Sequence, residues 1–195
     1  MADKKVEKKS GSKKEEATAA TINMEDDPEA LVQRTLIIFK PDAVQRGIVG
    51  EILTRFERVG LKIVATKMVN PNKDHYYRHY EEISKMISRR GQASFDQTLE
   101  FMTSGPVIAM VLEGVEAVPL VRKLVGSTEP MAAEMGTIRG DFAHMSFGYA
   151  NARHTGVPNL IHASGNVDEA RQEVEHWFKP EEIQSYQTLS EKYTR

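Results

Sequence analysis

The sequence contains no cysteine. This absence excludes a disulfide framework, a zinc site built on thiolates and a cysteine nucleophile. Long apolar runs are also missing, because no stretch approaches the ~20 residues that a membrane span requires. The N-terminus has no apolar segment of the kind that marks a secretory signal. We therefore expect a cytoplasmic protein that does not interact with a membrane.

The chain also lacks an excess of positive charge. Its formal net charge is -2, and residues 1–33, with six lysines and eight acids, account for all of it. Nucleic-acid affinity depends on clustered, uncompensated cations, so no nucleic-acid partner is expected and any anion site must be local. Residues 1–33 also have few large apolar side chains, and we predict a disordered extension before one folded domain at 34–195. A tether for a partner is the alternative for this extension.

Apolar periodicity predicts alternating strands and helices. Strands are expected at 34–40, 61–69 and 106–112 and in a segment that ends at His162; helices are expected at 48–59, 73–89, 94–104, 115–125 and 167–178. Residues 126–158 show no periodicity, and a loop of this length is more often functional than idle. This order favours an α/β (α+β) protein of the ferredoxin-like βαββαβ type, with a four-stranded antiparallel sheet covered by helices. A flavodoxin-like sheet is the alternative.

Glycine-rich phosphate-binding motifs are absent, since neither G-x-x-x-x-G-K-[ST] nor G-x-G-x-x-G occurs. If the protein binds nucleotides, side chains must supply the contacts. Lys40 follows a buried strand, where it is either a ligand-binding cation or a snorkelling strand-end lysine. Arg139 lies between two glycines in the long loop, where it either binds phosphate or pairs with Asp141. The remaining polar candidates in this group are Arg122, Thr128 and Asn159.

His162 ends an apolar run and is followed by Ala163, Ser164 and Gly165. The small neighbours argue against a packed core histidine and leave room for a ligand. A metal site would need partners, and the only close pair, His75 and His79, fits a solvated helix face better than a zinc site. The third interpretation is nucleophilic catalysis by a neutral imidazole nitrogen on a terminal phosphate. This mechanism requires an acceptor on the other ring nitrogen, for which Glu173 is the candidate.

Together these residues resemble the nucleoside diphosphate kinase family from about Arg34 to Phe178. The resemblance is carried by "RTLIIFKPDAVQRGIVGEILTRFERVGLKI", "SGPVIAMVLEG", "VGSTEP", "GTIRGDF" and "NLIHASG". It implies a ferredoxin-like sandwich and broad-specificity transfer of a γ-phosphate between nucleotides, such as ATP and a nucleoside diphosphate. It also implies Mg²⁺ held mainly by the nucleotide phosphates, with no metal ligand from the chain, and a homo-oligomer that is a hexamer or a tetramer.

The resemblance also implies a role for each matched residue. His162 is similar to the phosphorylated nucleophile, Glu173 to its orienting acceptor, and Ser164 to a hydrogen-bonding neighbour. Lys40 and Asn159 correspond to groups that meet the sugar hydroxyls, and Lys40 also reaches the transferred phosphate. Phosphate ligands correspond to Arg122, Thr128 and Arg139, and Tyr80 to the tyrosine that supports Lys40 and the phosphate site.

The sequence departs from the family pattern at several places. Gly165 stands where the family commonly has an aspartate near the metal, and Met135 replaces a common proline. Segments 83–92 and 143–158 are longer than usual, which obscures the residue that stacks on the base. Phe95 is the nearest aromatic, and Ser94 is the alternative at that position.

Two other functions compete with the kinase. A catalytically silent nucleotide sensor of the same fold would be expected to have lost the nucleophile or a cation, whereas His162, Lys40, Arg122 and Arg139 are all present. A metal-dependent hydrolase would use His75, His79 and a further ligand.

Overall fold

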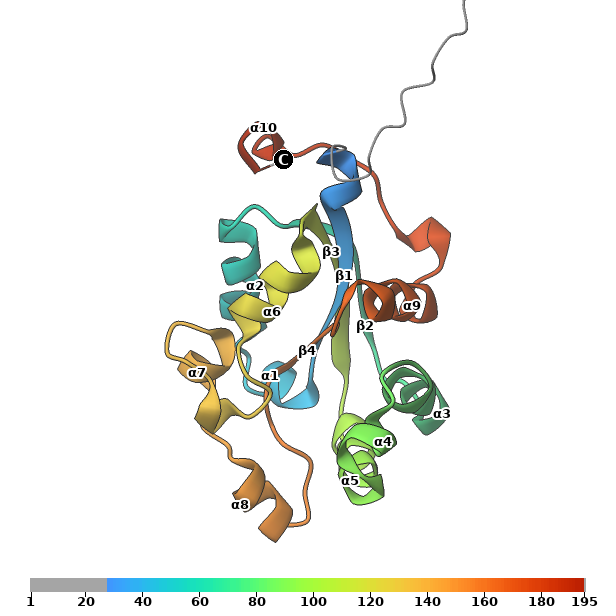
Figure 1. The fold of residues 1–195 in the computed structure, drawn as a ribbon, viewed down its shortest axis with the longest axis vertical. Coiled ribbons are helices and arrows are strands. Elements are labelled where there is room, and N and C mark those ends of the chain that lie inside the picture. The colour runs from blue at the N-terminus through green and yellow to red at the C-terminus, as the bar shows by residue number, and fades with distance from the viewer. Residues whose placement is uncertain (1–27, 195) are drawn as a thin grey trace, which may run out of the picture.

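The fold is built on one four-stranded sheet. The computed structural model describes residues 28–194, with strands β1 (Val32–Phe39), β2 (Lys62–Val69), β3 (Val107–Val115) and β4 (Ile161–Ala163). Their order is β2-β3-β1-β4, and every neighbouring pair is antiparallel. β3 therefore lies between β1 and β2, which is the split βαβ arrangement (Figure 1). The ferredoxin-like prediction is confirmed, and the flavodoxin-like alternative, which requires parallel neighbours, is wrong.

Helices cover both faces of the sheet (Figure 1). On one face lie α2 (Val49–Arg58) and α6 (Ala117–Val125), and on the other α3 (Lys73–Tyr77), α5 (Gln92–Met102) and α9 (Val167–Trp177). Side chains of β1 alternate between two apolar cores, because successive residues of a strand point to opposite faces. Ile37 and Phe39 belong to the core under α2 and α6, whereas Leu36 and Ile38 belong to the core under α9.

Several short elements were not expected from the sequence. They are α1 (Pro41–Gln45), α7 (Ile138–Phe142), α8 (Phe147–Ala152) and α10 (Glu191–Thr194), whereas α4 (Met86–Arg90) lies almost wholly within the predicted helix over 73–89. Segment 126–158 therefore contains α7 and α8, each begun by a hydroxyl side chain that caps the first turn, Thr137 and Ser146. Val115, predicted to start a helix, is instead the last residue of β3 and pairs with Val32.

The predicted helix over 73–89 is interrupted twice. After α3, residues Arg78–Ile83 form a π-helix, in which the Ser84 amide donates to the carbonyl of His79. Lys85 then adopts a left-handed conformation, with φ of 54°, and α4 starts in a new direction. Interruptions of this kind are common where side chains must be re-aimed toward a site.

The predicted boundary of the N-terminal extension lies too late. Residues 1–27 are outside the described range, so the predicted disorder there stays a prediction. Residues 28–33 are ordered: Pro28–Leu31 form a 3₁₀ turn and β1 starts at Val32. The Leu31 carbonyl accepts from the Glu116 amide, and Gln33 accepts from the Val118 amide, so pairing with the β3–α6 corner orders this segment despite its polar composition.

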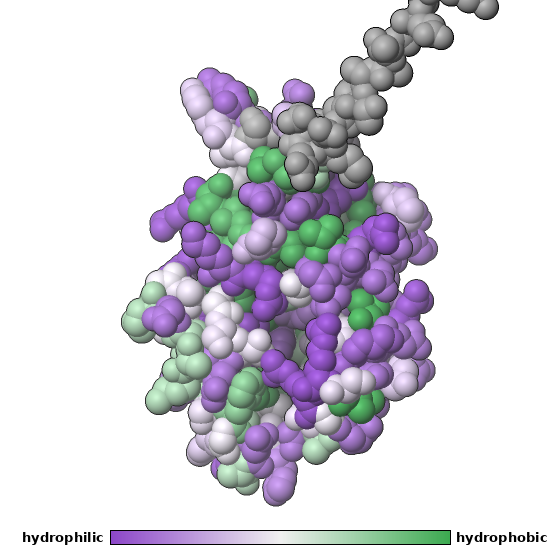
Figure 2. All heavy atoms as spheres, viewed as in Figure 1, coloured by the Kyte–Doolittle hydropathy of each residue, from purple (hydrophilic) through white to green (hydrophobic). Residues whose placement is uncertain are grey.

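The surface is mixed in character. Figure 2 shows hydrophilic side chains around a hollow between the two helical layers, with hydrophobic residues gathered nearer the end where β1 begins. Among residues 28–194, no helix combines the length and the apolar character needed to cross a bilayer.

Candidate active site

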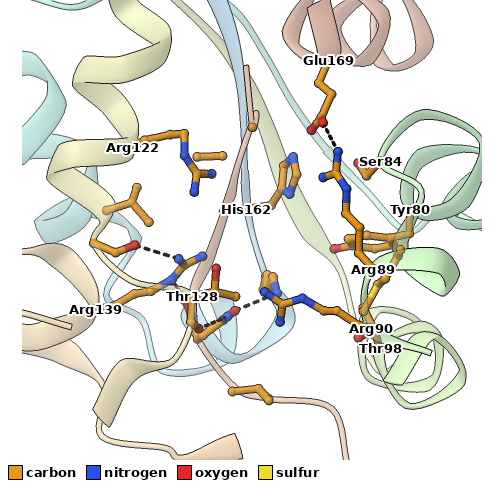
Figure 3. Close-up of a pocket in the computed structure, with 18 of the residues that line it drawn as sticks. Tyr80, Ser84, Arg89, Arg90, Thr98, Arg122, Thr128, Arg139, His162 and Glu169 are labelled. Atoms are coloured by element: carbon orange, nitrogen blue, oxygen red, sulfur yellow. Dashed lines mark hydrogen bonds and ion pairs between the residues drawn. The ribbon is translucent and has the colours of Figure 1, made fainter. Parts of the chain in front are cut away.

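The hollow is a pocket of about 370 Å³ at the end of the sheet where β1 and α6 finish and β4 begins. Five cationic side chains line it, together with His162 and the single lining carboxylate found within residues 28–194, Glu169; the cations are Lys40, Arg89, Arg90, Arg122 and Arg139. Figure 3 shows Arg122 and Arg139 on one wall of the pocket and Arg90 extending toward them from the opposite wall. An anion is therefore the ligand that this pocket favours.

His162 reaches the pocket from β4, where it pairs with Ile38 of β1. Its Nε2 lies 3.1 Å from both carboxylate oxygens of Glu173, on α9. Ser164 donates to the same carboxylate at 2.6 Å. Burial alone would raise the pKa of Glu173, but His162, with His79 and Ser164, outweighs burial and brings that pKa to about 2. An ionised Glu173 holds the ring proton on Nε2, so Nδ1 keeps its lone pair.

His79 and Tyr80 form a wall beside His162. The π-helix turns both rings toward it, with ring centroids 4.4 Å and 6.2 Å away. His79 is fully buried, and burial, followed by the neighbouring His162, lowers its pKa well below the usual value. Trp177 donates its indole N–H to Nδ1 of His79, which fixes the neutral tautomer. A neutral His79 adds no positive charge next to His162.

Lys40 and Asn159 meet directly, at 2.7 Å from Nζ to Oδ1. Asn159 also donates its amide to the carbonyl of Thr128 at 2.8 Å, so one side chain links β1, the loop after α6 and the approach to β4. The Lys40 ammonium is 8% exposed, and burial, followed by repulsion from Arg139 and Arg90 against attraction from Asp42, lowers its pKa to about 7. A bound anion would offset this repulsion.

Arg139 is fixed by backbone carbonyls rather than by an acid. Its guanidinium donates to the carbonyls of Asn159, Gly126, Ser127 and Ile161. The alternative of a pair with Asp141 is wrong, because Asp141 pairs with Arg55 on α2 and accepts from the Gly136 amide. Burial, with Arg122 and Arg90 nearby, lowers the pKa of Arg139 to about 9. The cation is thus held rigidly in the pocket wall.

The sequence analysis missed Asp42. Its carboxylate accepts from the Leu160 amide at 3.0 Å, and Leu160 has a φ of 72°, a left-handed conformation that is strained for a leucine. The Lys40 amide donates to the Leu160 carbonyl at 2.8 Å. Only two residues separate Asn159 from His162, and the turn at Leu160 allows both side chains to line the pocket. Its only sequence signal is the acid directly after Pro41.

The other predicted residues fall into two groups. Arg122, Thr128 and Tyr80 line the pocket; the Tyr80 hydroxyl is buried and has no hydrogen-bond partner among the described residues, so it does not bond to Lys40. Ser164 is fully buried behind His162, where it also accepts from the Leu36 amide. It therefore supports Glu173 and does not line the phosphate pocket.

Phe95 does not provide a stacking face for a base. It is 4% exposed and packs in the core under α9, against the ring of Tyr77. The phenylalanines that line the pocket are Phe101, the penultimate residue of α5, and Phe147, the first residue of α8. Helical periodicity puts Phe95 on the face of α5 that packs against the core. Its position in the sequence near the expected stacking residue does not show this orientation. Ser94, the alternative, does not line the pocket either.

His75 and His79 are not a solvated helix face. His75 stacks on His176 with centroids 4.0 Å apart, and His79 is fully buried against Trp177. His79 converges on His162 and Glu173, whose candidate ligand atoms lie within 4.8 Å of one another. His75 and His79 therefore have different surroundings, because α9 packs over the π-helix. The spacing of the two residues in the sequence does not reveal this packing.

The site combines a carboxylate-oriented histidine with fixed cations in an anion-binding pocket. On a ferredoxin-like sheet, this arrangement is that of a phosphate-handling enzyme, because fixed cations can stabilise the charge of a phosphoryl group. Comparisons with known proteins agree. The family model for nucleoside diphosphate kinase matches residues 33–183.

Relatives match most of the chain. A nucleoside diphosphate kinase from Borreliella burgdorferi is 45% identical over 156 residues, which cover 80% of this chain and 93% of the relative. One from Pyrococcus furiosus is 44% identical over 80% of this chain and 88% of its own. A solved Borrelia burgdorferi enzyme, described as a transition-state mimic with vanadate and ADP, has a TM-score of 0.82 at 43% identity and covers 84% of this chain and 97% of that one.

A Halobacterium salinarum enzyme, solved in complex with CDP, has a TM-score of 0.70 at 36% identity, with coverage of 83% of this chain and 97% of that one. The chain belongs to the nucleoside diphosphate kinase family. It is a phosphotransferase that moves a phosphoryl group between nucleotides.

Gly165 and Glu169 depend on each other. A Cβ at Gly165 would lie 2.4 Å from Oε2 of Glu169, whose Oε1 accepts from Asn166 at 3.0 Å and from Arg89 at 2.6 Å. We expect Gly165→Asp to displace this carboxylate, with its contacts to Asn166 and Arg89, and to lower the free energy of unfolding by up to about 1 kcal/mol, because the displaced atom is the far end of a flexible side chain. Adding Glu169→Ser should recover most of the loss, because neighbouring substitutions are not additive. Urea unfolding of the two single variants and the double variant measures both effects.

Gly148→Asp is the matched control, since a Cβ at Gly148 meets nothing within 4 Å. Strictly additive effects at positions 165 and 169 would contradict the interdependence.

Proposed function

We propose that the kinase works through a phosphohistidine on His162. Support comes from one observation above others: Glu173 engages Nε2, which leaves Nδ1 as the ring nitrogen with a free lone pair, beside the cationic pocket. Nδ1 attacks the terminal phosphorus of a nucleoside triphosphate, a new N–P bond forms, and the bond to the bridging oxygen breaks as the diphosphate leaves. A second diphosphate then takes the phosphoryl group by the reverse steps.

The remaining residues position and neutralise the substrate. Arg122, Thr128 and Arg139 bind phosphate oxygens, and Lys40 with Asn159 meets the sugar hydroxyls and the transferred phosphate. The orphaned, buried hydroxyl of Tyr80 donates to the same phosphate. Each is a fixed donor, so transition-state charge is stabilised with little reorganisation.

A divalent cation, which we propose to be Mg²⁺, enters with the nucleotide. The pocket fits this assignment because Glu169 is the only carboxylate that its described lining offers, so the phosphates must supply most of the hard oxygen ligands. The cation would neutralise phosphate charge. We also propose broad base specificity, since the polar contacts assigned here are to phosphate and sugar, and a cytoplasmic location, with which the absence of cysteine is consistent.

The phosphohistidine is tested with ATP labelled on the γ-phosphate and no acceptor. We expect a label that is stable in base and labile in acid, located on His162, and transferred to GTP when unlabelled GDP is added. His162→Ala should carry no label but still bind ADP, and His144→Ala, at an exposed histidine, should be labelled normally. A labelled, active His162→Ala protein would overturn the mechanism. Wild-type protein that binds nucleotide without label would indicate a silent nucleotide sensor.

ADP binding should depend on pH through Lys40. Its pKa of about 7 in the free protein must rise when phosphates bind, so binding above that pH takes up a proton. We expect an uptake of about half a proton near pH 7 that approaches one proton near pH 8.5, with affinity falling over the same range. Calorimetry in buffers of different ionisation enthalpy measures the uptake. An affinity that is flat from neutral to alkaline pH would show that Lys40 stays charged in the free protein.

We also propose that the protein is a homo-oligomer, a hexamer or a tetramer. Large apolar side chains are exposed near the pocket-forming loop, with Met131 at 71% and Met135 at 81% exposure, beside Tyr149 at 57%. Sedimentation should give one species of a hexamer or tetramer mass, and Met135→Glu should shift it toward smaller species. A monomer at all concentrations would refute the assembly.

A further inference from the structure

Two segments far apart in the sequence meet at the pocket. Segment 83–92 contributes α4, and segment 143–158 contributes α8; both are the segments that the sequence analysis singled out as longer than usual. Arg90 ends α4 and Phe147 begins α8. The Arg90 guanidinium carbon lies 5.2 Å from the centroid of the Phe147 ring, and both side chains line the pocket. This distance is within the range of a cation–π contact.

Arg90 is directed at the phosphate-binding cations. Figure 3 shows its side chain extending from α4 into the pocket, toward the side where Thr128 and Arg139 lie. Arg90 is among the cations that lower the pKa of both Lys40 and Arg139. Within residues 28–194, it has no carboxylate partner. A cation in this position, held among other cations, gains most from an anionic ligand.

Both ends of the contact are anchored. On one side, Arg89 pairs with Glu169 at 2.6 Å, which ties α4 to α9. On the other, the Phe147 amide donates to the Glu129 carboxylate at 2.7 Å, directly after Thr128. Ser146 caps α8 by accepting from the Tyr149 amide. The backbone that carries the Phe147 ring is therefore fixed, whereas the Arg90 side chain has no other polar partner within residues 28–194.

We propose that Arg90 is a further phosphate-binding residue and that Phe147 is a positioning residue that holds its guanidinium over the pocket. The ligand is the phosphate chain of a nucleoside di- or triphosphate, so the proposal rests on the proposed function of this site. It assigns a purpose to both long segments: together they supply one cation and its support. Phe147 then acts through Arg90 and does not read the base.

The test compares ADP with adenosine, which shares the base and sugar but has no phosphate. Arg90→Gln should weaken ADP binding by about tenfold or more, the size of a lost charge-assisted hydrogen bond, and leave adenosine binding unchanged. Phe147→Leu should weaken ADP binding about threefold, the size of an exposed cation–π contact. Phe147→Tyr should restore it. In the Arg90→Gln background, Phe147→Leu should add no further loss.

Two controls match these changes. Arg153→Gln removes the same charge from the exposed C-terminal end of α8, and Tyr149→Leu removes an exposed aromatic from the same helix. Neither should change ADP affinity. For Arg90→Gln and Phe147→Leu, KM should rise with kcat nearly unchanged and the thermal midpoint preserved.

Three results would overturn the proposal: equal losses for ADP and adenosine, which would mean that Phe147 contacts the base; additive losses in the double variant; or no loss with Arg90→Gln. A different result would refute the proposed function. Missing label on His162 in the wild-type protein would refute the phosphohistidine and leave the ADP and adenosine comparison intact.

Discussion

The pairing of β4 with β1 determines the geometry of the whole site. β4 has only three residues, and its register sets His162 beside Ile38, at the end of the strand from which Lys40 continues. The strained turn at Leu160 closes this pairing, because its carbonyl accepts from the Lys40 amide and its own amide donates to Asp42. A one-residue slip would turn His162 into the core under α6 and bring Ile161 to the pocket. The pairing of one short strand therefore places both His162 and Lys40.

Positive charge exceeds negative charge among the side chains that line the pocket. Within residues 28–194, five cations and one carboxylate line the pocket, whereas Glu173 lies behind His162 and is fully buried. The carboxylate is therefore close enough to orient the imidazole but is separated from the phosphate region by the ring itself. His79 stays neutral because burial lowers its pKa, so it shapes the wall without adding charge. An anion that enters the pocket therefore meets positively charged side chains together with the imidazole of His162.

Sequence reasoning reached the fold and most of the site because those features are local. Strand and helix periodicity predicted the sheet, and motifs indicated His162, Lys40 and Arg139, which the structure brings to one pocket. The predictions were wrong where tertiary contacts determine which side chains are buried. Phe95 was predicted to be in the pocket, but its helical phase buries it; His79 was assigned to a solvated face, but α9 packs over it. Asp42, Arg90 and Phe147 carry no recognisable local pattern, because their roles depend on partners 40 or more residues away.

Arg139 shows why the site is rigid. Within residues 28–194, its hydrogen bonds go to backbone carbonyls, so the same guanidinium that supplies charge also joins the loop after α6 to β4. Burying such a group costs free energy that its hydrogen bonds must offset, which accounts for its lowered pKa. A cation fixed in this way needs no reorganisation when phosphate arrives. Arg122, by contrast, is exposed and makes no comparable bond within residues 28–194, so the two arginines give the pocket one rigidly held cation and one that can adjust its position.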